Sequence, residues 1–82
     1  MFEYNICNQA DETIFEKQCL ALEKNIPGLI KEDLLTDVDG SKTQKYSLNG
    51  SEIIVCNSYY LDEVNIKSDI GLEQYFQYLG TY

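Results

Sequence analysis

The dipeptide Asn49-Gly50 is the feature that most constrains how this chain can fold. Both residue types readily take up positive φ, which the tight turn of a β-hairpin requires. The segment before it, 41–48, ends with Tyr46 and Leu48 on one face, and a β-branched apolar run follows over 51–60. The sequence therefore predicts two antiparallel strands joined at this turn, the second being a central strand covered on at least one face.

A helix is predicted upstream of the hairpin, over residues 11–25. Its apolar residues are spaced by four, three and four positions and form one stripe, made of Phe15, Cys19, Leu22 and Ile26. Asn8 and Asp11 are rival N-caps, because each can accept a bond from a free backbone N–H of the first turn. Pro27-Gly28 ends the helix, since proline disfavours helical geometry in the residue before it.

The remaining segments are less sharply defined. Residues 2–6 and 63–67 alternate between apolar and polar, so each could be a short strand. Residues 29–39 could be a second helical turn or a first strand that ends at Val38, with Asp39-Gly40 as the turn that follows. A closing helix is predicted over 70–79, where four apolar residues follow helical spacing: Leu72, Tyr75, Phe76 and Leu79.

This order predicts an α+β fold in a single domain, residues 1–82. Three or four strands form a small antiparallel meander, packed against an N-terminal and a C-terminal helix in an αβββα-like arrangement. With 82 residues, 44% of them hydrophobic, the chain can build one core. The helices cover one face of the sheet, and the other face is either solvated or a docking surface.

The composition argues against catalysis. The chain has no histidine, the usual general base near neutral pH, and no arginine, the usual clamp for phosphate or carboxylate groups. Its five glycines are isolated, so there is no glycine-rich phosphate loop. Cys19 and Cys56 fall within a helical stripe and a β-branched run, where free cysteine is typically a small buried hydrophobe. We expect no catalytic residues and no cofactor.

An acidic run over residues 32–40 invites comparison with a calcium loop. Placing Gly40 at the sixth loop position puts Asp37 and Asp39 at ligand positions three and five. Positions one and twelve then fall on Leu35 and Tyr46, which supply no carboxylate. The run therefore predicts an ordinary turn, and we expect no metal site.

The charge balance indicates the kind of partner. Fourteen acidic residues face six lysines, giving a net charge of −8. Such a surface repels nucleic acids and anionic membranes, and it attracts basic proteins. Three cysteines, an odd number without a C-x-x-C pair, and the lack of a signal peptide indicate a cytoplasmic protein with reduced thiols.

The segment N57-S-Y-Y-L-D-E63 contains the candidate binding residues. In a regular strand, Tyr59 and Tyr60 point to opposite faces, so one of them is exposed near Asp62 and Glu63. An exposed aromatic ring beside carboxylates suits a partner rich in arginine and lysine. A second acidic patch is predicted from four residues within a span of eight: Glu32, Asp33, Asp37 and Asp39.

The sequence thus favours a small acidic protein-binding module. We expect an inhibitor that occludes a basic, nucleic-acid-binding surface of another protein, imitating the charge of a nucleic acid. Anti-CRISPR, anti-restriction and nuclease immunity proteins of phages and bacteria have this general character, although no motif here matches one family. The alternative is a structural or regulatory subunit, without catalytic activity, that forms a homodimer through the uncovered sheet face or through Tyr75, Tyr78 and Tyr82.

Overall fold

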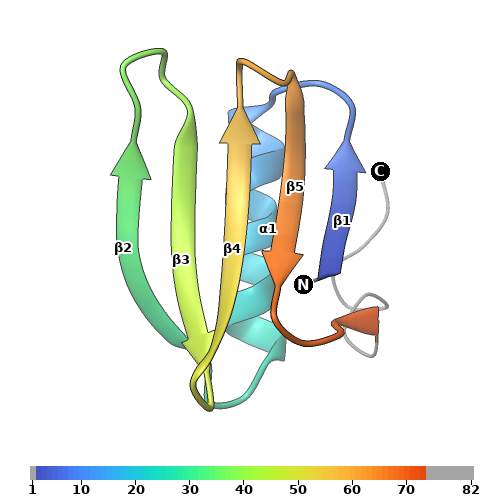
Figure 1. Ribbon diagram of the computed structural model, residues 1–82, viewed down its shortest axis with the longest axis vertical. Helices are drawn as coiled ribbons and strands as arrows, with labels where there is room; N and C mark the ends of the chain where they lie inside the picture. The colour runs from blue at the N-terminus through green and yellow to red at the C-terminus, as the bar shows by residue number, and fades with distance from the viewer. Residues whose placement is uncertain (1, 74–82) are drawn as a thin grey trace.

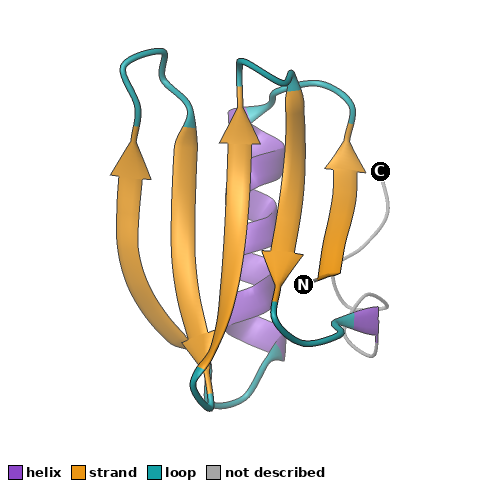
Figure 2. Ribbon diagram, viewed as in Figure 1, coloured by secondary structure: helices purple, strands orange, loops and turns teal. Residues whose placement is uncertain are grey.

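The computed structural model describes residues 2–73 (Figure 1). The elements follow one another as β1 (Phe2–Cys7), α1 (Glu12–Asn25), β2 (Ile30–Thr36), β3 (Lys42–Leu48), β4 (Ser51–Ser58) and β5 (Glu63–Ser68). The five strands form one antiparallel sheet in the order β1-β5-β4-β3-β2. The helix covers one face of this sheet, and no other described element covers the opposite face (Figure 2). We call that opposite face the open face.

The predicted αβββα order is wrong, because a strand precedes the helix and the sheet has five strands. Residues 2–7 pair with β5, and residues 30–36 form an edge strand beside β3. The sequence left both segments open because neither has a fully buried face: β1 is exposed or half-buried, and β2 is exposed along its whole length. Of the predicted second helix, residues 70–72 are not helical, and residues 74–79 lie outside the described residues.

The predicted helix is confirmed within one residue at its start, and Asp11 is its N-cap. The Asp11 carboxylate accepts a hydrogen bond from the Ile14 N–H at 3.0 Å. The Asp11 N–H donates to the buried Asn57 Oδ1 at 3.0 Å, which fixes the start of the helix against β4. In the described part of the chain no helix is both long and apolar enough to cross a membrane.

The core lies between α1 and the sheet. The stripe predicted from the helical spacing is buried in full, and it packs against apolar residues of three strands and the segment after β5: Tyr46, Leu48, Ile53, Val55, Val64, Ile66 and Leu72. Leu72 is held in place by its N–H, which donates to the Tyr4 hydroxyl at 3.0 Å. This contact fixes the segment after β5 against β1.

Tyr46 links the helix to the sheet. Its side chain is fully buried, and its hydroxyl donates to the Glu23 carboxylate at 2.6 Å. Glu23 also pairs with Lys31 of β2 at 3.6 Å. A single buried phenol thus connects β3 with the last turns of α1, and through Glu23 with the edge strand.

A β-bulge interrupts β2 between Lys31 and Leu34. The buried Gln44 side chain satisfies the backbone there, because its Nε2 donates to the carbonyl oxygens of Glu32 at 2.8 Å and Asp33 at 3.3 Å. A bulge and charged side chains are devices that protect an exposed strand edge from pairing with another chain.

Replacing Tyr46 with Phe removes the hydroxyl that joins helix and sheet. Hydrogen bonds to charged groups contribute about 1.5–3 kcal/mol, and we expect about 1–2 kcal/mol here because Glu23 is partly solvated. The melting temperature should fall by about 5–10 °C in a domain of this size. The control is Tyr60→Phe, at an exposed ring, which should leave the melting temperature unchanged in the same calorimetric scan.

Alkaline pH should destabilise the protein through the same residue. Burial, and then the bond to Glu23, raise the pKa of Tyr46 well above its ordinary value. Above a pH of about 10 the unfolded chain loses the phenol proton while the folded protein keeps it, so stability is complete below that pH and falls above it. Urea unfolding between pH 9 and 11 should show a steeper decline for the wild type than for Tyr46→Phe. Parallel declines would contradict this assignment.

Candidate protein-binding surface

Two loops lie side by side at one end of the sheet, the upper end in Figure 1. Residues 37–41 join β2 to β3, and residues 59–62 join β4 to β5. The Tyr59 N–H donates to the Ser41 hydroxyl oxygen at 2.9 Å. The Tyr59 ring lies against Gly40, where an added Cβ would meet its Cε2 at 3.5 Å. These contacts fix the position of one loop relative to the other.

The first loop is shaped by its own aspartates. The Asp37 N–H donates to the Ser41 carbonyl at 2.8 Å, and the Asp39 carboxylate accepts from the Ser41 N–H at 2.9 Å. Gly40 has a φ of +89°, a value that side chains disfavour and glycine adopts freely. The turn predicted at Asp39-Gly40 is therefore confirmed.

Ser41 connects the loops electrostatically as well. Its N–H, and then its hydroxyl, donate to Asp39 and lower the pKa of that carboxyl below its usual value. The same hydroxyl oxygen accepts from Tyr59, so one serine links the charge of the first loop to the backbone of the second. An aspartate is already ionised at neutral pH at its ordinary pKa, so this lowering extends the charged state of Asp39 further into acid.

The second loop differs from the prediction for the tyrosine pair. Strand β4 ends at Ser58, so Tyr59 and Tyr60 lie in the turn and neither enters the core. Ser58 ends the strand by accepting the Leu61 N–H at its hydroxyl. Asp62 takes a φ of +54° and accepts from the Ala10 N–H at 2.9 Å, which anchors the loop to the start of the helix.

The result is a projecting surface that mixes apolar and acidic side chains. Tyr60 is 89% exposed and Val38 fully exposed, and Tyr59 and Leu61 are about half exposed. We call this the two-loop surface and define it by Asp37, Val38, Asp39, Tyr59, Tyr60, Leu61 and Asp62. None of its carboxylates forms an ion pair with a lysine in the part of the chain that the structure describes.

A groove of about 360 Å³ runs from this surface onto the open face. Small side chains of β3 and β4 are part of its lining, namely Thr43, Cys56 and Ser58. Asp37, Asp39 and Tyr60, from the two loops, also line it. The structure therefore brings together three of the predicted binding residues from two separate segments.

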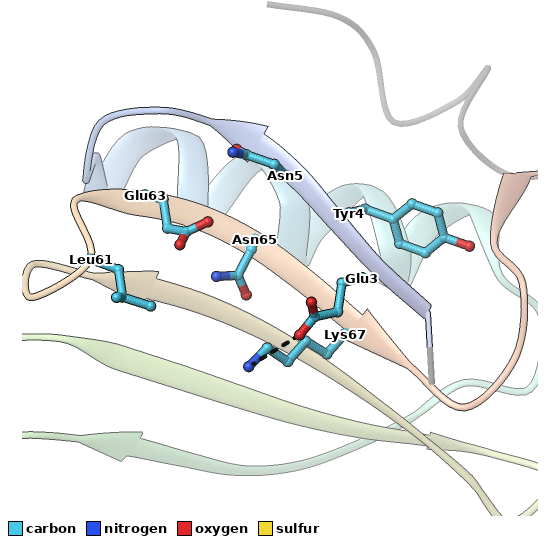
Figure 3. A pocket seen from close by; sticks show the side chains of 7 residues that line it. All are labelled: Glu3, Tyr4, Asn5, Leu61, Glu63, Asn65 and Lys67. Carbon is cyan, nitrogen blue, oxygen red and sulfur yellow. Dashed lines mark ion pairs between the residues drawn. The ribbon is translucent and has the colours of Figure 1, made fainter.

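A second groove, of about 390 Å³, lies on the other side of the β4–β5 loop (Figure 3). We call it the Asn65 groove. Leu61 and Glu63 line it at the loop, and the rest comes from β5 and β1: Glu3, Tyr4, Asn5, Asn65 and Lys67. Adjacent residues of one loop, Tyr60 and Leu61, thus line different grooves.

The structure separates the remaining predicted residues. Glu32 and Asp33 lie at the bulge of the edge strand β2 and line neither groove. Glu63 begins β5 and belongs to the Asn65 groove. The predicted acidic patch is therefore divided, with Asp37 and Asp39 on the two-loop surface and the other two on the sheet edge.

Sequence reasoning missed Ser41, Val38 and Asn65. No sequence signal distinguishes Ser41 from other turn serines, because its role depends on the second loop lying beside it. The alternation over 63–67 does place Asn65 on the open face, and register pairs it with Asn5. Only the full sheet shows that this amide is buried.

Known proteins add no identification: no protein-family model matches the sequence, and neither a curated protein nor a solved structure does. The described residues contain no group of three His, Cys, Asp or Glu side chains that could hold a metal ion. The three cysteines are free, and burial raises the pKa of the Cys19 thiol, which disfavours the reactive thiolate.

Replacing Ser41 with Ala should loosen the link between the loops. The hydroxyl bond to Asp39 disappears, so the pKa of that carboxyl should rise toward its usual value, measured by NMR titration of the carboxyl carbon. The matched control is Ser47→Ala, on the open face of the same hairpin. An unchanged Asp39 titration in Ser41→Ala would show that the hydroxyl does not make this bond.

Proposed function

We propose that this protein is a small acidic protein-binding module that docks its two-loop surface on a basic surface of another protein and thereby occludes it. One observation carries the proposal: exposed aromatic and aliphatic side chains lie among carboxylates that form no ion pair with a described lysine, on two loops that are hydrogen-bonded to each other. Tyrosine is enriched among the residues that dominate binding energy at interfaces.

The loops are suited to binding because they are already ordered. Tyr59 is held by Ser41 and Gly40, and Asp62 by Ala10. Binding to a preformed surface avoids much of the entropy lost when flexible loops become ordered. Tyr60 and Val38 can therefore contact a partner without rearrangement of the backbone.

Electrostatics favours a basic partner. The net charge is −8, and Lys31, Lys42 and Lys67 pair with carboxylates outside the two-loop surface. The field of the unpaired aspartates attracts lysine- and arginine-rich surfaces and raises their rate of association. Nucleic-acid-binding proteins carry such surfaces, because they neutralise phosphates with the same side chains. Occlusion of a nucleic-acid site, without catalysis, is the activity we propose.

The proposed setting is the cytoplasm of a bacterium or of a cell infected by a phage, where anti-CRISPR, anti-restriction and immunity proteins act. The three free thiols are compatible with a reducing compartment. Contact with nucleic acid or with a membrane is not part of the proposal, because both are anionic.

A self-associating subunit is the second candidate, and the edge strand β2 supports it. Ile30, Leu34 and Leu35 are each at least half exposed there. The bulge between Lys31 and Leu34 opposes pairing through this edge. Tyr75, Tyr78 and Tyr82 lie outside the described residues. A sedimentation series separates the candidates, since a concentration-independent monomer eliminates the second.

The decisive variant is Asp37→Asn/Asp39→Asn, which removes two charges and keeps an oxygen acceptor at each position. The probe is a fluorescent nona-arginine peptide, and we expect affinity to fall about three- to tenfold, with a shallower dependence on salt. The control, Glu52→Gln/Asp69→Asn, removes two charges where β4 begins and β5 ends, at the opposite end of the sheet. Equal losses in both variants would contradict a localised site.

A further inference from the structure

The Asn65 groove contains a polar atom whose bonding capacity is unused. Asn65 is only 7% exposed, and its Oδ1 is buried without a hydrogen-bond partner among the described residues. In Figure 3 this oxygen points toward Glu3 and Lys67 within the groove. Buried carbonyl oxygens are nearly always hydrogen-bonded, so an unpaired one that lines a groove indicates a site for a donor.

The charges around Asn65 indicate which donor fits. Two carboxylates, Glu3 and Glu63, line the same groove, and one ammonium, Lys67, pairs with Glu3 at 3.6 Å. Glu63 precedes Asn65 by two residues on β5, and Glu3 faces Lys67 across the β1–β5 ladder. Three acceptor groups therefore surround one space, and a cation that donates in several directions would satisfy them together.

The Glu3–Lys67 ion pair lies in the lining of the groove and is open to solvent. The Glu3 side chain is 68% exposed and that of Lys67 42%. Ion pairs this exposed contribute little to stability, so an entering cation can displace the lysine at small cost.

From these contacts we infer that the Asn65 groove binds the guanidinium of an arginine side chain presented by a partner protein. A guanidinium is planar and has five N–H donors, so it can bond an amide oxygen and two carboxylates at once, which an ammonium does less well. The chain contains no arginine, so neither this chain nor a second copy can supply the group. The inference rests on the proposed function for the identity of the partner, but the groove is tested separately.

The experiment titrates the protein with acetyl-arginine methylamide and follows the side-chain amide signals by NMR. We expect saturable shifts at Asn65, and none with acetyl-citrulline methylamide, which has the same shape without the charge. Glu63→Gln should weaken the arginine probe several-fold. The Asp37→Asn/Asp39→Asn variant should bind it as the wild type does, so failure of the two-loop surface and failure of the groove are distinguishable.

Asn65→Val separates a binding role from a structural one. Valine removes the unpaired acceptor and suits a strand, so the melting temperature should stay the same or rise while affinity for the arginine probe falls about tenfold. A lower melting temperature would identify the amide as a structural group and overturn the inference. So would an Asn65 signal that does not shift, or shifts equally with the citrulline probe.

Discussion

The described part of the structure depends on the helix α1, which covers one face of a five-stranded sheet. Burial of the stripe that includes Phe15 and Leu22 supplies the apolar core. Two hydrogen bonds then tie the helix to the sheet: Asn57 accepts from the N–H of the N-cap residue Asp11, and Tyr46 donates to Glu23 near the end of the helix. Because no described element covers the open face, its strands carry mostly polar side chains there. That face and the loops at its end are consequently available for binding, and both grooves open there.

The carboxylates of this molecule include some that are bonded within the architecture and others that no described lysine neutralises. The carboxylates that support the architecture are bonded within it: Asp11 caps the helix, and Glu23 receives the Tyr46 hydroxyl. Asp37 and Asp39 shape a turn with part of their bonding capacity, yet no described lysine neutralises them. The turn uses the side-chain oxygens of its aspartates for its own hydrogen bonds and also presents their charge to solvent, so a binding surface can arise there without weakening the core.

Much of the local structure could be predicted from the sequence, because it is set by neighbouring residues. The helix, its Asp11 cap and the turns at Gly40 and Gly50 all follow from short-range chemistry. The arrangement of the strands could not be predicted in this way, since β1 pairs with a segment more than fifty residues away and β2 is too exposed to show a pattern. The candidate site, too, was predictable only where it depends on neighbouring residues. The exposure of one tyrosine was expected, whereas the role of Ser41 and the burial of Asn65 depend on contacts between distant segments.

The position of β1 has a consequence for the order of folding. Phe2 pairs with Ser68, so this ladder joins the two ends of the described chain, while β2 to β5 follow one another through short turns. Contacts between distant segments form slowly, because a long loop must close first. The meander can assemble early, and β1, although it precedes the other described strands in the chain, docks only once β5 is in place. The Asn65 groove, which needs Glu3 and Asn5 from β1, is then complete only when folding is complete. A ligand of this groove would therefore bind the fully folded protein and not a partly folded form.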